Sequence, residues 1–444
     1  MTSTERKVAY GAMLLFVFAI GSKAVSFFKE LAIASEFGVG AVADAYILGF
    51  TWATWLPGIF VSVTMASIVP IGRSLKHRTP PEDELFFREF AGLSVLIGFV
   101  IGGLTAAAPV FFSSFGADSQ GVYESLRLTL PVLAVLVPAA FFAAYCSARL
   151  VDQQRHSNLA FEALPPAVIL IYLLTANNPT LIGLCAATAT GYVLYASATG
   201  YVLYATVTAS APHQGGQSVR PLLGLRSRGW REFAGAAIIM IVGNACAGSL
   251  MVVDQFQASF LPEGSISILG YATRLLMLPA TLLSLVIARS MLPVFSEFAA
   301  KGQTRQLNRL VRKFALIAFA LGLLGAAVIW LLAPWLVQLA FERGSFTAQD
   351  TEATVQAMRW GIFQLPGFAA AIVVVQALLS QRRFVVVAVS GIFNLLAKVL
   401  LNASLAPFLG VPGITLGTAI VLSGSLLILS YFFFSTTREV TDGG

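Results

Sequence analysis

The sequence contains few charged residues and few side chains of the kinds that bind metals. Of its 444 residues, 11% are Asp, Glu, Lys or Arg, whereas soluble domains are usually about 25% charged. The three cysteines, Cys146, Cys185 and Cys246, lie in apolar stretches without CxxC spacing, which is typical of small core residues. The sequence has no HExxH, no aspartate-rich diphosphate motif and no Walker loop. Enzyme chemistry therefore has little support, and we expect no cofactor and no metal site.

Apolar residues dominate the chain instead. They make up 57% of it, too many for a soluble protein with a polar surface, so we predict a polytopic membrane protein. A helix needs about 20 apolar residues to cross the hydrocarbon, and no alternation typical of a barrel is present. The first apolar stretch is followed by lysines rather than by a small-residue cleavage site, so we expect it to remain as a span. The twelve predicted spans are 8–34, 41–70, 88–115, 124–149, 158–176, 181–208, 232–260, 266–296, 313–341, 353–380, 384–407 and 412–435.

The basic residues are distributed unevenly between the connectors. One set of connectors carries seventeen Lys and Arg residues, and the opposite set carries three, Arg127, Arg343 and Arg359. Basic connectors stay on the cytoplasmic side, so both termini are predicted to be cytoplasmic. This asymmetry also accounts for the net charge of +7, and no nucleic-acid partner is expected.

The chain contains a weak copy of itself. Three matched positions lie 222 to 224 residues apart, about half the chain: Gly40 and Gly264, Pro57 and Pro279, Pro70 and Pro293. We predict domains at 1–210 and 232–444, joined by a cytoplasmic linker at 211–231. The expected fold is all-α, with about twelve transmembrane helices in two six-helix lobes. An even number of spans per repeat relates the lobes by a pseudo-two-fold axis along the membrane normal.

A second, tandem repeat lies within the sixth predicted span. The string ATGYVLYAS at 189–197 is followed at once by ATGYVLYAT at 198–206. Nine residues advance a helix by about two and a half turns, so the two copies are predicted to point to opposite faces.

Five basic residues fall inside predicted spans: Lys23, Lys29, Arg274, Arg289 and Lys398. A charge within the membrane is costly, so such residues usually face a polar cavity. The alternative is that they snorkel to the interface, which suits Arg289 best. It suits Lys23 and Lys29 less well, because Glu30 and several small residues accompany them.

Several strings resemble one family. SFFKELAIASEFGVGAVADAYILGF, ASFLPEGSISILGYATRLLMLP and LAFERGSFTAQDTEATVQAMRWGIFQLPGF resemble the MurJ (MviN) lipid II flippases of the multidrug/oligosaccharidyl-lipid/polysaccharide exporter superfamily. The resemblance runs from about residue 10 to 435. It implies a V-shaped pair of lobes in a bacterial inner (plasma) membrane. The implied activity is flipping of an undecaprenyl-diphosphate-linked sugar from the cytoplasmic to the outer leaflet by alternating access, with enzymes of cell-envelope glycan synthesis as further partners.

The resemblance also implies the substrate-binding residues. Lys23 and Lys29 stand where the family usually has arginines in its first span, and Glu30 stands for the acid that follows. Asp44 matches the acid of the ADA motif, and Arg274 matches the arginine that begins the eighth span. The physics agrees, because a diphosphate crossing a membrane needs fixed cations. Two alternatives remain: internal neutralisation of these cations by acids, and a gating role for Asp44.

The sequence departs from the family at three places. The arginine-rich stretch of the second span is LPGIFVS here, and the tenth-to-eleventh connector reads QRRF. Two further C-terminal spans typical of the family are not found in this sequence. Either lipid II or an exopolysaccharide repeat unit therefore remains possible as the cargo.

A last group lies in the predicted C-terminal lobe. The resemblance implies a sodium site between the seventh, eleventh and twelfth spans, built from acidic and amide side chains. This chain has Asp254, Asn394 and Thr418 there, with Lys398 one helical turn after Asn394. We predict that Lys398 pairs with Asp254 and puts a tethered ammonium where sodium would sit. The alternative is that Lys398 snorkels outward while Asp254 is protonated or pairs with Arg274.

Three other functions compete with a flippase. A drug/cation antiporter of the same superfamily predicts a carboxylate-rich cavity, whereas the charges here are basic. A membrane glycosyltransferase would need clustered catalytic acids, and the acids here are scattered. The third alternative is a scaffold that has lost transport.

Overall fold

The computed structural model describes residues 3–76, 80–112, 120–153, 158–210, 221–227 and 229–442. Within these ranges every regular element is a helix, as the composition predicts. The chain divides into two compact units. Unit 1 contains residues 1–37 and 41–241, and unit 2 contains residues 38–40 and 242–444.

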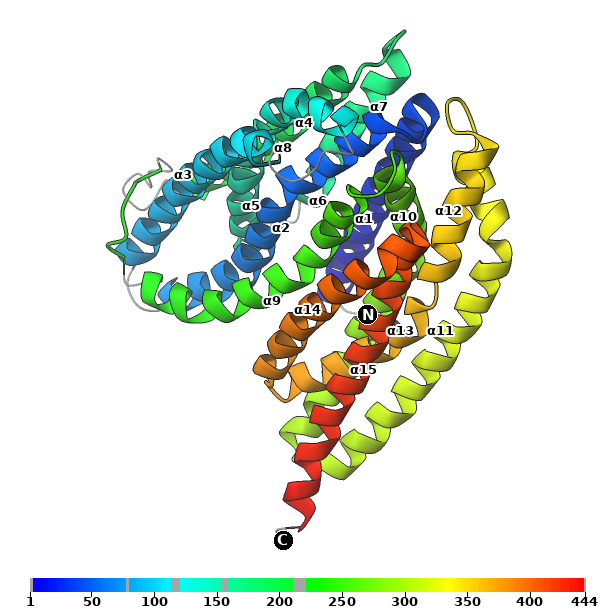
Figure 1. The fold of residues 1–444 in the computed structure, drawn as a ribbon. Helices are drawn as coiled ribbons and strands as arrows, with labels where there is room; N and C mark the ends of the chain where they lie inside the picture. Colours follow the sequence, from blue (N-terminus) through cyan, green and yellow to red (C-terminus); the bar gives the residue numbers. More distant parts are fainter. Residues whose placement is uncertain are drawn as a thin grey trace. The chain divides into compact units, whose positions relative to one another are not determined.

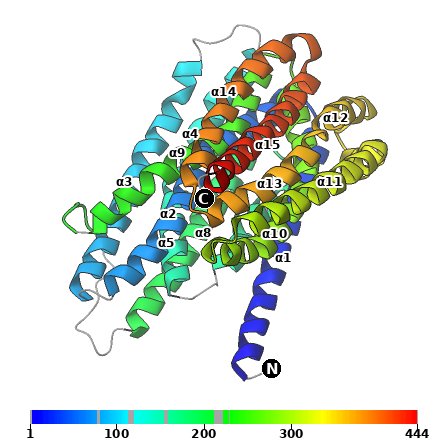
Figure 2. The same ribbon diagram turned by 90° about the horizontal axis from the view of Figure 1, so that it is seen from below.

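The helices follow the chain through unit 1 and then through unit 2 (Figures 1 and 2). Unit 1 contains α1 (Ser3–Phe37), α2 (Ala41–Lys76), α3 (Pro80–Phe112), α4 (Gln120–Leu133), α5 (Leu136–Asp152), α6 (Asn158–Phe161), α7 (Leu164–Thr175) and α8 (Leu181–Ser210). Next come α9 (Gly229–Ala258), α10 (Ser265–Ala300), α11 (Thr304–Phe341), α12 (Ala348–Gly361), α13 (Gln364–Ser380), α14 (Phe384–Leu409) and α15 (Val411–Asp442). The division falls inside α9, between residues 241 and 242, whereas the boundary predicted from the sequence is the linker at 211–231.

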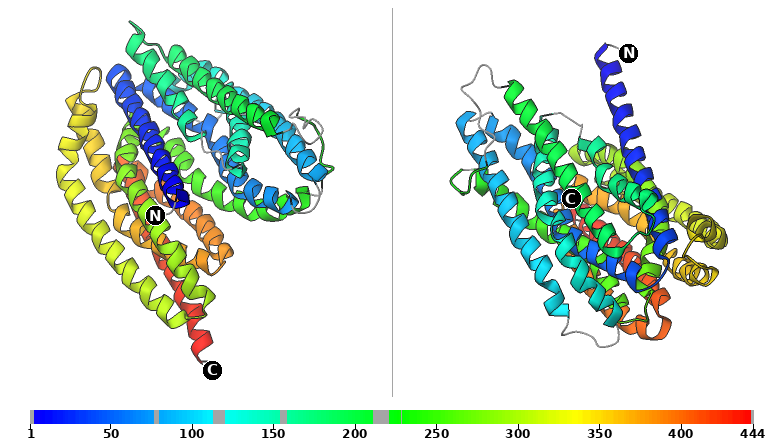
Figure 3. Two further views of the ribbon diagram at one scale, coloured as in Figure 1. Left: turned by 180° about the vertical axis from the view of Figure 1, so that it is seen from behind. Right: turned by 90° about the horizontal axis from the view of Figure 1, so that it is seen from above.

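Among the described residues, seven helices are long and apolar enough to cross a membrane, or eight if the bent pair α12–α13 counts as one span. These eight candidate spans match eight of the twelve predicted spans. The candidate span Glu124–Asp152 contains both α4 and α5. The predicted span at 158–176 is divided into α6 and α7. Figure 3 shows α1 (blue) as one uninterrupted helix. Lys23, Lys29 and Glu30 lie within its bounds.

Two of the spans are broken in the same way, one in each unit. Pro138 and Pro366 carry no N–H to donate to the carbonyl four residues earlier. The residue before each proline instead donates to the carbonyl three residues back: Val137 to Ala134 at 3.1 Å and Leu365 to Ile362 at 3.0 Å. The second break bends the helix pair by 41°. The missing N–H of each proline therefore accounts for the break in its span.

A glycine on a neighbouring helix allows close approach at each break. A Cβ at Gly98 of α3 would lie 2.7 Å from Pro138 Cα, and one at Gly322 of α11 would lie 2.8 Å from Pro366 Cα. Gly98 and Gly322 are 224 residues apart, the same offset as the sequence repeat. The two units therefore share a packing device as well as a residue pattern.

Each unit has its own apolar core. In unit 1, Phe86 and Phe90 of α3 pack with Tyr145 of α5 and Leu203 of α8. In unit 2, α11, α13 and α15 lie side by side (Figure 2), and Phe295 of α10 is fully buried among them. Many large apolar side chains lie outside these cores, such as Leu339 at 80% and Phe408 at 88% exposure. Such a surface suits hydrocarbon rather than water.

The connector between α11 and α12 is held by its own polar residues. Thr347 and Asp350 form a capping box at the start of α12. Arg343 donates to the carbonyls of Leu339 and Ala340 at the end of α11, and Thr351 donates to Glu342 at 2.7 Å. These residues shape the loop locally.

Candidate functional site

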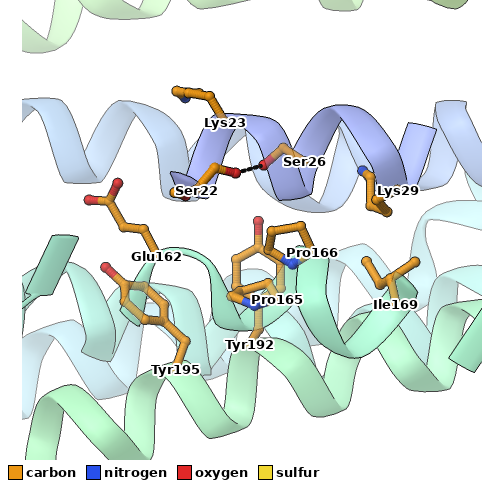
Figure 4. A pocket seen from close by; sticks show the side chains of 10 residues that line it. All are labelled: Ser22, Lys23, Ser26, Lys29, Glu162, Pro165, Pro166, Ile169, Tyr192 and Tyr195. Atoms are coloured by element: carbon orange, nitrogen blue, oxygen red, sulfur yellow. Dashed lines mark hydrogen bonds between the residues drawn. The ribbon is translucent and has the colours of Figure 1, made fainter. Parts of the chain in front are cut away.

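A cavity of about 250 Å³ lies within unit 1, beside α1. We call it the lysine cavity. Ser22, Lys23, Ser26 and Lys29 line it from α1, and Figure 4 shows them opposite side chains of α7, α8 and the turn before α7. The facing residues are Glu162, Pro165, Pro166, Ile169, Tyr192 and Tyr195. Both predicted lysines therefore line one polar cavity inside a mostly apolar unit.

The two lysines differ in burial. The Lys29 side chain is 8% exposed, its Nζ lies 2.6 Å from Glu30 Oε1, and it lies 5.4 Å from the centre of the Phe50 ring. Lys23 is exposed. The ion pair neutralises Lys29 where burial would otherwise be costly. Lys23 lies at the cavity edge, and Figure 4 shows its side chain extending away from the facing residues.

The acid in this cavity comes from an irregular stretch of chain. Glu162 follows α6 and precedes Pro165 and Pro166 at the start of α7. Two prolines suit a helix start, where the missing N–H groups have no helical partner. This turn carries Glu162 into the cavity wall opposite α1. The sequence shows the prolines, but only the fold places the carboxyl beside the lysines.

The tandem repeat contributes to this cavity with one copy only. Tyr192 and Tyr195 of the first copy line the cavity, and Tyr195 shares a 3.0 Å hydrogen bond with Ser147. The equivalent tyrosines of the second copy, Tyr201 and Tyr204, are 72% and 56% exposed. The predicted half-turn between the copies is confirmed. No sequence pattern predicted that these two tyrosines line a cavity.

The other two predicted substrate-binding residues lie on separate helices. Asp44 is 1% exposed and stands in the first turn of α2, where the helix dipole favours a carboxylate. Arg274 belongs to α10 in unit 2, with its guanidinium carbon 5.8 Å from the centre of the Tyr271 ring.

A second polar group is buried within unit 2. We call it the Lys398 cluster: Asp254 of α9, Lys398 and Asn402 of α14, and Thr418 of α15. Lys398 Nζ lies 2.8 Å from Asp254 Oδ1, and the Lys398 residue is fully buried. The ammonium also donates to the Ile414 carbonyl at 3.0 Å and to the Thr418 hydroxyl. All three ammonium protons therefore have oxygen acceptors.

The predicted Asp254–Lys398 ion pair is present, but its amide partner differs from the prediction. Asn394 donates to Ser425 at 3.1 Å. The amide that contacts Asp254 is Asn402, which donates to Oδ1 at 2.6 Å. Asn402 stands one turn after Lys398, so the same four-residue spacing that links Asn394 to Lys398 could have identified it.

Comparisons with solved structures identify the fold. A structure described as "Lipid II flippase MurJ, inward closed conformation" has a TM-score of 0.77 at 17% identity, covering 95% of this chain and 87% of the other. An inward-facing multidrug resistance MATE family transporter of the MOP superfamily has a TM-score of 0.76 at 14% identity, covering 95% and 96%. The chain thus shares the helical fold of these two proteins.

Sequence comparisons identify the family. The model of the family described as lipid II flippase MurJ matches residues 33–441, and the chain belongs to that family. A probable lipid II flippase MurJ of Bdellovibrio bacteriovorus is 25% identical over 371 residues, which is 80% of this chain and 68% of the relative. A namesake from Vibrio cholerae is 22% identical over 439 residues, covering 94% of this chain and 81% of the relative. The resemblance noted from the motifs is confirmed.

Proposed function

We propose that this multi-pass bacterial membrane protein moves an undecaprenyl-diphosphate-linked sugar from the cytoplasmic to the outer leaflet by alternating access. The observation that carries the proposal is the family match over residues 33–441. Cargo enters and leaves chemically unchanged, so the protein acts as a transporter and not as an enzyme. Lipid II is the first candidate cargo because the relatives are named for it.

Reconstitution tests this function directly. The purified chain is placed in lipid vesicles with lipid II or with another undecaprenyl-diphosphate-linked sugar, and the share of cargo accessible from outside is followed over time. We expect protein-dependent exchange of at least one of these lipids. Exchange of neither lipid above protein-free vesicles would refute the proposal, and the preferred lipid identifies the cargo.

Lys23 and Lys29 are proposed to bind the diphosphate in the lysine cavity. An ammonium contacts phosphate as a compact point charge with three donors. Glu30 compensates Lys29 when no cargo is bound, and it can release the ammonium when a phosphate arrives. Arg274 and Asp44 are proposed as further substrate-binding residues, with a gating role for Asp44 as the alternative.

The Lys398 cluster is proposed to set the driving force. Its ammonium is held by a carboxylate, a backbone carbonyl and a hydroxyl, the oxygen types that would coordinate a free monovalent cation. A tethered cation cannot be exchanged with the solution. Transport is therefore expected to depend on the membrane potential or a proton gradient and not on sodium.

The proposed orientation puts both termini and the basic connectors in the cytoplasm. In a variant whose three cysteines are replaced by alanine, single cysteines at Gln349 and Gln303 report the two sides, and both positions are exposed. We expect an impermeant maleimide to label the Gln349→Cys protein in intact cells and the Gln303→Cys protein only after permeabilisation. The reverse pattern would contradict this orientation.

A further inference from the structure

The segment before α9 is held against α3 by one buried carboxylate. Glu89 of α3 is fully buried. Its oxygens accept from the backbone N–H of Arg226 at 2.9 and 3.1 Å and of Ser227 at 3.1 Å. The indole N–H of Trp230 donates to Glu89 Oε2 at 2.8 Å. A buried charge with this many donors fixes the geometry of the chain around it.

Further contacts hold the same segment. Leu222 N–H donates to the Arg88 carbonyl at 2.9 Å. A Cβ at Gly224 would lie 2.8 Å from Glu89 Oε1, so a glycine allows this close approach. The Trp230 ring is stacked on Phe90, with centroids 5.6 Å apart and an interplanar angle of 10°. Figures 1 and 2 show the green chain before α9 running beside α3.

This segment presents apolar side chains outward. Leu223 and Leu225 are 69% and 66% exposed, and Leu222 is 37% exposed. Arg226 and Arg231 are also exposed. We call these five residues the linker surface. Helices that lie at a membrane interface combine apolar and basic side chains, and this non-helical segment exposes the same combination.

The position of Glu89 along α3 agrees with a location at the membrane interface. The predicted third span begins at residue 88, so Glu89 lies in its first turn, near the N-terminal end of α3. Amphipathic segments insert their apolar side to about 5–10 Å at the headgroup boundary. The linker surface is thus level with the outermost part of the span, on the side with the basic connectors.

We propose that the linker surface is a lipid-binding site. Leu222, Leu223 and Leu225 insert at the acyl boundary, and Arg226 and Arg231 bind the phosphates of anionic lipids. Glu89 is the positioning residue that holds the surface in place. The occupant is the anionic bilayer, because two exposed guanidinium groups match its charge and the leucines match its apolar layer.

The test uses the full chain in nanodiscs with spin labels on cysteines placed at Leu223 and Leu225. Collisions with oxygen, which enters lipid, are compared with collisions with a water-soluble nickel chelate. The control label is at Gln303, an exposed position in the α10–α11 turn. We expect the oxygen-to-nickel ratio to be several-fold higher at both leucine sites than at Gln303. Frequent collisions with the nickel chelate at the leucine sites would overturn the proposal, because the labels would then lie in water. Few collisions with either reagent would also overturn it, because a protein segment would then cover the labels.

Two further variants separate the roles of the residues. In the Arg226→Gln/Arg231→Gln protein, the enrichment of anionic over zwitterionic lipid near the label is expected to fall roughly five-fold per arginine. In the Glu89→Gln protein the labels should become mobile, because an amide nitrogen cannot accept the donated N–H groups. The matched control is Glu297→Gln, an exposed carboxyl paired with Lys301. Unchanged lipid enrichment in the first variant, or unchanged mobility in the second, would contradict the assignment.

Discussion

Replacing Lys23 and Lys29 together by glutamine is expected to reduce flipping to the rate of protein-free vesicles. A hydrogen bond to a charged group contributes about 1.5–3 kcal/mol. Losing two such contacts to a diphosphate therefore weakens binding by about 10²- to 10⁴-fold. The measurement is exchange of the undecaprenyl-diphosphate-linked cargo in reconstituted vesicles.

Three controls distinguish loss of binding from loss of folding. Lys29 pairs with Glu30, so the thermal unfolding of the double variant is compared with that of the unmodified protein. Lys301→Gln removes an exposed ammonium of the α10–α11 turn and should leave flipping unchanged. The Lys23→Arg/Lys29→Arg protein should flip cargo, because guanidinium groups also bind phosphate. Full activity of the double glutamine variant would remove the lysine cavity from the mechanism.

Replacing Lys398 by methionine is expected to destabilise unit 2 by about 3–5 kcal/mol. Removing one partner of a buried ion pair leaves the other charge buried without compensation, and this lowers the free energy of unfolding strongly. Asp254 would keep its bonds to Asn402 and Thr418 but lose its ammonium. The measurement is thermal or denaturant unfolding of the purified protein in one detergent.

A double-mutant cycle tests the reason for this effect. The Asp254→Asn/Lys398→Met protein carries neither charge, so it should be more stable than either single variant. The Glu297–Lys301 pair provides the comparison, and Lys301→Met should change stability little there, because both side chains are exposed to solvent. If the two effects at Asp254 and Lys398 simply add, the ion pair does not determine stability.

The same cluster predicts how the protein responds to sodium. In the unmodified protein, exchanging sodium for choline should change neither stability nor flipping. Lys398→Ala opens space beside Asp254, the Ile414 carbonyl and Thr418. Sodium at about one hundred times its dissociation constant should then stabilise the variant by roughly 2.7 kcal/mol. A strict sodium requirement for flipping by the unmodified protein would rule out the tethered-cation proposal.

Properties that depend on the local sequence could be predicted from it. Most spans were found because crossing hydrocarbon requires about 20 apolar residues in a row. The kinks at Pro138 and Pro366 follow from a missing N–H, and the opposite faces of the tandem repeat follow from helical periodicity. Lys398 was predicted to meet Asp254 because each charge alone would be costly in the membrane.

Only the tertiary structure shows which side chains line the same cavity or contact each other. Glu162, Tyr192 and Tyr195 come from different parts of the chain than Lys23, and no spacing in the sequence indicates that they line one cavity. Asn394 and Asn402 lie one helical turn before and one turn after Lys398. Helix packing places Asn402 beside Asp254 and Asn394 beside Ser425. Glu89 lies 137 residues before Arg226, whose N–H it binds. The sequence by itself determined that this chain crosses a membrane, because transfer into hydrocarbon is a property of consecutive residues. The contacts that make its cavity and its anchored linker depend on the packing of distant helices.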